Sequence, residues 1–252
     1  MHFSIQGVGP PLLLIHGWAM HGGIFAHLLP YLDSHFTIHT VDLPGHGRSF
    51  AQRFELGNAL VELADYVADL APTVLVGWSL GGTIATQLAL ESPGNVRAVV
   101  PIASSPCFVA TAGWPNGMTP SAITGFADEL TQNWKVVVDR FLALEVMGSP
   151  NERAELRWLR ESVYAHGKPN LAALMSGLAM LESTDLRARL GALSVPSLWL
   201  GGSRDRIVPP QAIRVAAELS GGRAEILAAA HAPFLTHPKL IANFIIEFAA
   251  AS

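Results

Sequence analysis

The sequence has few charged residues, a single cysteine and no long hydrophobic run, and each shortage excludes a class of protein. Charged residues make up 14% of the 252, and the formal net charge of -4 gives no general attraction to nucleic acid or anionic membranes. The one cysteine, Cys107, excludes an internal disulfide framework, fits a reducing compartment and reads as a small buried hydrophobe. No apolar stretch approaches the roughly 18 residues of a membrane span. We therefore expect a cytoplasmic protein without nucleic-acid or membrane partners.

Motifs for metals and nucleotides are also missing. The chain contains no P-loop, CxxC pair, HExxH or dinucleotide fingerprint, so we expect neither a metal nor a cofactor. The first 18 residues have no basic segment, and their apolar run stops at His16. They read as strands rather than as a signal peptide.

What the sequence does contain is an alternation of short aliphatic runs and helical patterns. Half of the residues are apolar, and the length suits one domain with an insertion. Strands are expected at residues 12–15, 36–41, 73–76, 98–102, 196–200 and 224–227. Helices are expected at residues 56–70, 80–91, 210–219 and 238–250. This order predicts an α/β fold with a mostly parallel central sheet flanked by helices.

The alternation fails between about Phe108 and Asp185. This segment opens with the Gly- and Pro-rich passage AGWPNGMTP and continues through helical patterns at residues 121–147, 152–164 and 170–181. We expect it to form a helical lid above the C-terminal edge of the sheet, where α/β folds bind their ligands. The predicted organisation is a core of residues 1–108 and 186–252, interrupted by a lid of residues 109–185.

The stretch VLVGWSLGG contains the pattern GxSxG, with Ser79 between Gly77 and Gly81. A strand is expected before it and a helix after it, which is the context of a nucleophile elbow. Such a turn strains the serine backbone, and crowding by neighbouring chains admits only glycine at the flanking positions. In an arbitrary sequence the bare pattern is as often a simple turn. Here the context favours a nucleophile, which requires an acid and then a base later in the chain.

The base is expected on the loop after the last strand. His231, in AAAHAPF, occupies that loop, whereas His237 precedes Pro238 and is better explained as a helix cap. Six other histidines fall at positions typical of surface, helix or strand: His2, His21, His27, His35, His39 and His166.

The acid is expected on the loop GGSRDRIVP, where Asp205 follows the strand at residues 196–200. The loop after the preceding strand reads Ala-Ser-Ser at residues 103–105 and offers no carboxylate. The alternative role for Asp205, a surface ion pair with Arg204 or Arg206, would be a weak interaction.

Two backbone N–H groups are expected to bind the developing oxyanion. One belongs to Leu80, at the start of the helix that follows the elbow. The other comes from the loop HGWA, where Gly17 lets the chain turn and Trp18 donates its N–H while its ring walls the pocket. The glycine-rich turn at residues 42–49 is interpreted as structural support.

At this point the sequence resembles a known family. HGW, DLPGHGRS, GWSLGG, GSRDRIVP and HAPF occur in the order typical of the α/β-hydrolase superfamily. More narrowly, GWSLGG together with ASSPCF, RFLALEVMG, STDLR and AAAHAPF closely resembles the BioH family of pimeloyl-[acyl-carrier protein] methyl ester esterases. The resemblance implies an α/β-hydrolase fold, a monomer, and a serine carboxylesterase of biotin biosynthesis that releases methanol from a carrier-bound methyl ester.

The resemblance also implies roles for individual residues. Ser79 would be the nucleophile, His231 the base and Asp205 the acid that orients it. The family's substrate contacts fall on Trp18, Ser79, Leu80 and His231, and on the lid residues Phe141, Leu142, Ala143, Leu144 and Glu145. From the residues alone, Phe141 and Leu144 at helical spacing fit lid core as well as they fit an acyl groove.

The predicted partner, an acyl-carrier protein, is acidic, so docking requires local positive charge. Arg140, Arg153 and Arg157 match the family's carrier-binding arginines, and Arg160 extends the helical stripe of Arg153 and Arg157, away from Glu152 and Glu155. A further basic position of the family holds valine here, at residue 136, with Lys135 beside it. A solvated helix face is the alternative interpretation.

Two other functions remain open from the sequence. A general short-chain carboxylesterase with the same triad would be indifferent to the carrier protein, and only the lid motifs argue against it. A non-catalytic binding module of the same fold usually lacks part of the triad, whereas this chain keeps all three members.

Overall fold

The computed structural model describes residues 1–252 and has a seven-stranded sheet at its centre. The strands are β1 (His2–Gln6), β2 (Pro11–Ile15), β3 (Thr37–Asp42), β4 (Thr73–Trp78), β5 (Val96–Ile102), β6 (Leu198–Gly202) and β7 (Arg223–Leu227). They lie in the order β1-β3-β2-β4-β5-β6-β7. Only β1 runs antiparallel to its neighbour, and every other pair is parallel. The predicted α/β fold with a mostly parallel sheet is confirmed.

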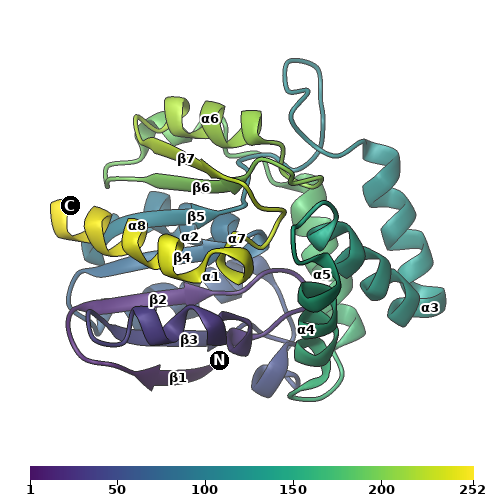
Figure 1. Cartoon of the computed structure of the whole chain (residues 1–252), viewed down its shortest axis with the longest axis horizontal. Coiled ribbons are helices and arrows are strands. Elements are labelled where there is room, and N and C mark those ends of the chain that lie inside the picture. Colours follow the sequence, from purple (N-terminus) through teal and green to yellow (C-terminus); the bar gives the residue numbers. More distant parts are fainter.

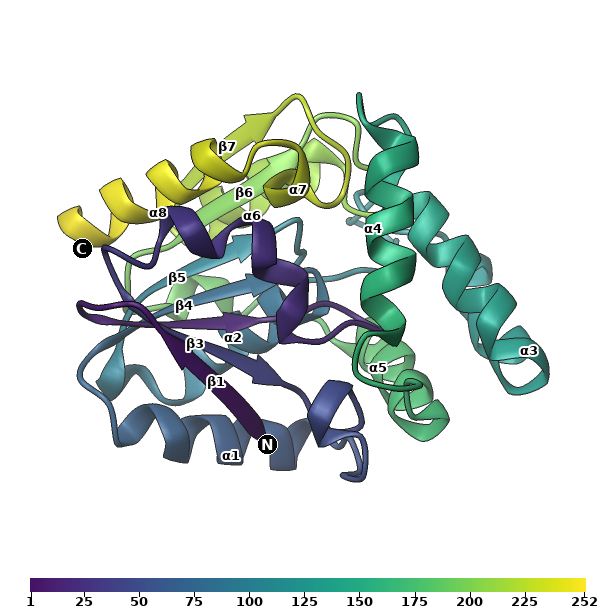
Figure 2. The same ribbon diagram turned by 60° about the horizontal axis from the view of Figure 1, so that its bottom comes forward.

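Helices cover both faces of this sheet, which explains why its central strands are mostly apolar. The covering helices are α1 (Leu56–Ala68), α2 (Leu80–Glu91), α6 (Pro210–Leu219), the short α7 (Pro233–Thr236) and α8 (Pro238–Ala251). The α8 helix lies on one face and α1 on the other, with α2 packed beside α1 (Figures 1 and 2). All six residues of β4 are buried, as a strand covered on both faces requires. None of the helices combines the length and the hydrophobicity needed to cross a membrane.

The lid consists of three helices inserted between β5 and β6: α3 (Pro120–Val146), α4 (Glu152–Tyr164) and α5 (Leu171–Ser183). They lie together at one end of the sheet (Figures 1 and 2). The two ends of the lid meet, since Cys107 forms a β-bridge with Asp185 and the Leu186 N–H donates to the Pro106 carbonyl at 2.8 Å. The lid therefore leaves and re-enters the core at one place, which supports the proposed boundaries at residues 109 and 185.

The helix predicted at residues 121–147 differs in one respect, because α3 is kinked. Asn133 has non-helical backbone angles, φ -150° and ψ 74°. Its side-chain oxygen accepts a hydrogen bond from the Val136 N–H at 3.4 Å, as at a helix N-cap. A local side-chain acceptor thus replaces the helical bond pattern, so the second half of α3 is in effect a new helix.

Candidate active site

The nucleophile elbow lies where β4 ends and α2 begins. Ser79 has φ 54° and ψ -118°, a strained conformation for a residue with a side chain. Close packing explains the glycines, as predicted. A Cβ atom on Gly77 would lie 2.1 Å from the Gly81 carbonyl oxygen, and one on Gly81 would lie 2.2 Å from the Ile15 carbonyl oxygen. Glycine at both flanking positions therefore allows the close backbone packing around the strained turn.

Three side chains from separate loops meet at this elbow. The Ser79 hydroxyl lies 2.9 Å from Nε2 of His231, and Nδ1 of His231 lies 2.8 Å from Oδ2 of Asp205. Because a carboxylate only accepts hydrogen bonds, the imidazole proton belongs on Nδ1 and Nε2 is free to accept from Ser79. All three residues are buried, with Ser79 1% exposed. The arrangement has the geometry of a serine nucleophile, a base and an orienting acid.

The second oxygen of Asp205 is fixed by the backbone rather than by an arginine. Oδ1 accepts hydrogen bonds from the N–H groups of Ile207 at 2.8 Å and Val208 at 2.9 Å. The neighbouring Arg204 and Arg206 are exposed, and Arg204 donates to the Gly148 carbonyl at 3.0 Å. A surface ion pair as the role of Asp205 is therefore excluded in this structure.

Backbone donors are available beside the serine. Leu80 is the first residue of α2, where the N–H has no acceptor within its own helix. The N–H of Trp18 donates to no group of the protein, and the loop that carries it is held by His16. The His16 imidazole donates from Nδ1 to the Gly17 carbonyl at 2.8 Å and accepts from the Leu43 N–H at 3.0 Å. Burial, with the neighbouring His46, lowers the pKa of His16 to about 3, so the ring stays neutral in this structural role.

The turn at residues 42–49 supports the same loop, as predicted. The Asp42 carboxylate accepts hydrogen bonds from the N–H groups of Gly22 at 2.7 Å and Arg48 at 2.9 Å.

Both backbone polar groups of His231 are in use, one toward the core and one toward the lid. Its carbonyl accepts the indole N–H of Trp78 at 2.8 Å, and its N–H donates to the carbonyl of Glu145 in α3 at 2.9 Å. This role of Trp78 was not predicted from the sequence. The one sequence signal for it was that Trp78, at the end of a buried strand, carries an indole N–H that needs a hydrogen-bond acceptor.

The lid closes over the site through Trp18. The Trp18 indole donates to the Leu174 carbonyl of α5 at 2.8 Å, and its ring meets that of Phe141 of α3 edge-on at 4.9 Å between centroids. Trp18 is fully buried and Phe141 is 2% exposed. Trp18 therefore joins the predicted oxyanion loop to two lid helices.

The predicted lid contacts differ among themselves. Phe141 packs against Trp18, and the backbone carbonyl of Glu145, four residues later, accepts the hydrogen bond from the His231 N–H. Leu142 is buried in the hydrophobic core, while Ala143 and Leu144 are partly exposed and make no polar contact with the triad. Both carboxyl oxygens of Glu145 are buried without a hydrogen-bond partner. Burial raises the pKa of Glu145 well above its usual value, and the negative charge of Asp205 raises it further.

The predicted docking arginines are exposed, but they are not equally free. Arg153 and Arg157 project from α4 without an ion-pair partner. Arg160 forms a two-pronged ion pair with Asp139 of α3, at 2.6 and 2.9 Å. Arg140 pairs with Glu129 and lies over the Phe126 ring at 5.6 Å. Among these arginines, Arg153 and Arg157 are therefore the two that are free of an ion-pair partner.

Other residues near this surface also have contacts that spacing alone does not show. Glu155 is buried and accepts from the Thr236 hydroxyl at 2.7 Å, and Glu152 accepts from the Gly148 N–H at 3.0 Å, so both point away from the arginine stripe as expected. Lys135 is exposed, with its ammonium 5.9 Å from the Trp134 ring centroid, and Val136 beside it is 48% exposed.

Two smaller predictions have mixed outcomes. His237 occupies the N-cap position of α8, as predicted, but its side chain makes no capping hydrogen bond. Its ring lies 3.3 Å from the Ala228 carbonyl instead. Cys107 is buried with its thiol toward the Val109 carbonyl at 3.2 Å, which confirms its interpretation as a small buried residue.

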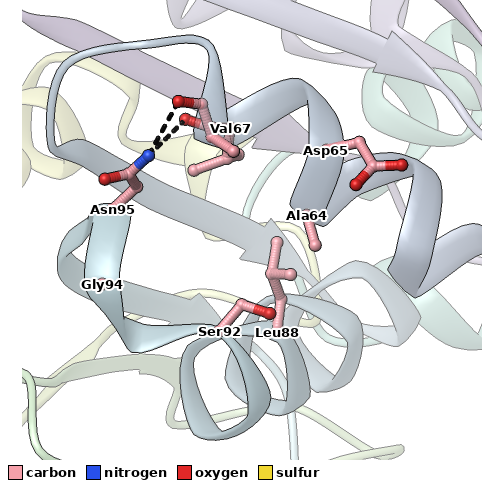
Figure 3. Close-up of a pocket in the computed structure, with 8 residues that line it drawn as sticks. Ala64, Asp65, Val67, Leu88, Ser92, Gly94 and Asn95 are labelled. Atoms are coloured by element: carbon pink, nitrogen blue, oxygen red, sulfur yellow. Dashed lines mark hydrogen bonds between the residues drawn. The ribbon is translucent and has the colours of Figure 1, made fainter.

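A hollow of about 420 Å³ lies between α1 and the far end of α2 (Figure 3). It is lined by residues such as Asp65, Leu88 and Ser92, and Asn95 closes one side by bonding to the Val67 and Ala68 carbonyls. Ser92 has no base beside it among these residues. Because the hollow lies at the opposite end of α2 from Ser79, the triad remains the candidate site.

Comparison with known proteins agrees with the fold and the elbow. The model of the family described as "Alpha/beta hydrolase family" matches residues 12–244. The chain therefore belongs to the alpha/beta hydrolase family.

Within that family, curated relatives match over their whole length. A protein of Stenotrophomonas maltophilia (strain K279a) is 44% identical over 100% of this chain and 97% of its own. One of Xanthomonas campestris pv. campestris (strain B100) is 43% identical over 100% and 99%, and one of Xylella fastidiosa (strain M12) is 42% identical over 99% of each. All three are named pimeloyl-[acyl-carrier protein] methyl ester esterase, and the chain belongs to their family.

Solved structures match the same fold at lower sequence identity. An esterase from Exiguobacterium antarcticum superposes with a TM-score of 0.88 at 21% identity, over 99% of this chain and 95% of that one. The enol-lactonase from Burkholderia xenovorans LB400 gives 0.86 at 19% identity, over 99% and 96%. These likenesses establish the α/β-hydrolase fold.

Proposed function

We propose that this protein is a serine carboxylesterase that hydrolyses the methyl ester of pimeloyl-[acyl-carrier protein] methyl ester. The products are pimeloyl-[acyl-carrier protein] and methanol, in biotin biosynthesis. The observation that carries the proposal is the contact of Ser79, His231 and Asp205 at 2.9 and 2.8 Å, in a chain whose full-length relatives bear that name. The proposal includes a cytoplasmic, monomeric enzyme, and the single buried thiol suits a reducing compartment.

Acylation begins at Ser79. Its hydroxyl oxygen attacks the carbonyl carbon of the methyl ester while Nε2 of His231 takes its proton, across the 2.9 Å contact. The resulting imidazolium is stabilised by the Asp205 carboxylate on Nδ1. The negative charge on the former carbonyl oxygen is bound by the N–H groups of Leu80 and Trp18. When the intermediate collapses, His231 returns the proton to the departing methoxy group and methanol leaves.

Deacylation repeats these steps with water. His231 removes a proton from the water as it attacks the acyl-serine, and the same two N–H groups bind the second oxyanion. The proton then passes to Ser79, and the distal carboxyl of the pimeloyl chain is released. The Asp205 carboxylate stays in place because two backbone N–H groups fix its other oxygen.

The lid would decide which bond reaches the serine. A thioester is more reactive than a methyl ester, so a selective enzyme must keep the thioester end of the substrate away from Ser79. Arg153 and Arg157 are exposed and unpaired on α4, which suits docking of an acidic carrier on the outside of the lid. The acyl chain would then pass Phe141 and Trp18, which form the apolar wall of the site.

The proposal is tested with the carrier-bound diester itself. Purified protein incubated with pimeloyl-[acyl-carrier protein] methyl ester is expected to release methanol, measured by gas chromatography. Mass spectrometry of the carrier is expected to show loss of the methyl group with the thioester intact. The Ser79→Ala variant, with an unchanged fold, should be slower by about 10³-fold or more. Release of the acyl chain from the carrier, or equal activity of the variant, would contradict the proposal.

A second measurement separates carrier recognition from general esterase activity. Arg153→Glu and Arg157→Glu, singly and together, are expected to lower kcat/KM on the carrier substrate by about 10-fold per substitution, because each replaces attraction with repulsion. Hydrolysis of p-nitrophenyl acetate should be unaffected. Arg214→Glu, an exposed residue on α6, makes the same charge change away from the lid and serves as control. If the Arg153 and Arg157 variants kept the wild-type ratio of activity on the carrier substrate to activity on p-nitrophenyl acetate, a general short-chain carboxylesterase would be favoured.

A further inference from the structure

Glu145 differs from the other buried acids of the protein. Asp42 and Asp205 each accept two backbone N–H bonds, and Glu155 accepts a hydroxyl bond from Thr236. Glu145 is 1% exposed, and neither of its carboxyl oxygens has a partner. A carboxylate buried without partners is strongly destabilising, so the group must carry a proton or move.

The charged groups around Glu145 offer it no compensation. On the core side it faces Asp205, whose negative charge opposes ionisation, and the backbone N–H of His231. Arg204 and Arg206 flank Asp205 but are exposed, and Arg204 donates to the Gly148 carbonyl instead. On the lid side, the nearby acid Glu152 accepts from the Gly148 N–H. No cation therefore pairs with the Glu145 carboxyl.

The position of Glu145 connects it to the base of the triad. It lies in the last turn of α3, one helical turn after Phe141, which packs against Trp18. Its own carbonyl accepts the N–H of His231 at 2.9 Å. Any movement of this turn would therefore remove one of the two backbone anchors of His231.

We propose that Glu145 is a positioning residue for His231 that works as an uncharged side chain, holding the last turn of α3 against the triad. The neutral acid packs into the closed lid next to Asp205. When it ionises as the pH rises, the unpaired charge moves toward water and takes the turn of α3 with it. His231 then loses its anchor, and turnover falls. This inference rests on the proposed function only in that His231 serves as the base for Ser79.

The direction of the pH dependence follows from the raised pKa of this carboxyl, caused by burial and by Asp205. The unfolded chain releases the proton near the ordinary value of 4.5, whereas the folded protein retains it to higher pH. The folded state therefore binds more protons above that value, and its stability falls as the pH rises. Replacing Glu145 by a neutral residue removes this loss.

The test compares wild type with Glu145→Gln and with Glu145→Leu, two neutral side chains of similar size. The difference in Tm between either variant and wild type is expected to become more positive from about pH 5 to pH 8. The expected increase is about 3 °C for each pKa unit by which folding shifts the carboxyl. For p-nitrophenyl acetate, the ratio of kcat/KM at about pH 9 to that at about pH 7 should rise about 3-fold or more in the variants. Infrared spectra of wild type near neutral pH should contain a protonated carboxyl band that Glu145→Gln lacks.

Glu182→Gln provides the matched control, since Glu182 is an exposed acid on the lid helix α5 with no polar contact. Its Tm difference and pH ratio should match wild type at every pH. The proposal is overturned if the Glu145 variants follow the same pH profiles as Glu182→Gln, or if the infrared band is absent. Failure of the proposed function would look different, because Ser79→Ala would then hydrolyse p-nitrophenyl acetate as fast as wild type.

Discussion

On the core side of the active site, atoms are held where there is no room to move, whereas on the lid side they are held by a few separate contacts. Gly77 and Gly81 approach neighbouring backbone so closely that no Cβ atom fits, and Asp205 is fixed by two N–H groups. The lid meets this site through the Trp18 indole, the Phe141 ring and the carbonyl of Glu145. The comparison teaches that close packing fixes the catalytic groups of the core, whereas the position of the lid depends on a small number of individual contacts.

The two regions should also differ in how pH affects stability, and this is the largest effect we expect. Burial lowers the pKa of His16 to about 3 and that of His46 to about 4. The unfolded chain takes up these protons near 6.5, so the folded state binds fewer protons below that value. Stability is therefore complete above about pH 6.5 and is lost as the pH falls toward 3, by on the order of 5 kcal/mol. The core histidines should therefore make stability fall at low pH, whereas the raised pKa of Glu145 in the lid should make stability fall as the pH rises.

Urea unfolding at a series of pH values measures this loss. His46→Phe removes a ring whose Nε2 is buried without a partner, and should make the acid loss less steep. His35→Gln, at an exposed position, should leave it unchanged. An equally steep loss in His46→Phe would show that the core histidines are not its source.

Paired glycine substitutions test the packing difference directly. Gly81→Ala would put a Cβ atom 2.2 Å from the Ile15 carbonyl oxygen, and should destabilise the protein by about 1–3 kcal/mol or more. Gly125→Ala, in the lid helix α3, meets nothing within 4 Å and should stabilise it by about 0.5–1 kcal/mol. Thermal unfolding of the two variants gives both values. Similar changes in both would remove the distinction between a close-packed elbow and a looser lid.

The two indole hydrogen bonds allow a smaller and more selective comparison. Trp78→Phe removes the bond to the His231 carbonyl in the core and should lower kcat on a small ester by about 3- to 10-fold, the equivalent of one hydrogen bond. Trp18→Phe removes the bond to Leu174 in the lid and should speed limited proteolysis between α3 and α5. If Trp78→Phe also increased lid proteolysis to the same degree, core and lid would not be separable in this way.

The elbow and the order of the triad could be predicted because their signals are local. GxSxG, the strand before it and the helix after it are adjacent in sequence, and Asp205 and His231 each follow a recognisable strand. Parallel strands then bring these loops to one edge of the sheet. The need for Gly77 and Gly81 could be predicted for the same reason, because the tight turn of a nucleophile elbow leaves no room for a Cβ atom at either position.

Contacts between segments that are distant in the sequence could not be predicted. The Trp78 indole reaches His231 across 153 positions of sequence, and Arg160 turns to Asp139 on another helix. The kink at Asn133 depends on one side chain competing with the helix, and the missing partners of Glu145 depend on everything packed around it. Spacing along a helix indicates which residues share a face, but not what that face meets.

If Glu145 positions His231 as we propose, their hydrogen bond would give the lid a role in timing as well as in access. Because Ser79 is 1% exposed, a substrate would reach it only after lid side chains move, and under our proposal that movement would also release the backbone N–H of His231. The open protein would therefore be a slow hydrolase. Full activity would return only when a bound acyl chain allows α3 to return to its closed position. Other esters and thioesters that bind the open form would mostly dissociate unhydrolysed. The enzyme would then select its substrate by whether the acyl chain allows the lid to close and His231 to regain its hydrogen bond.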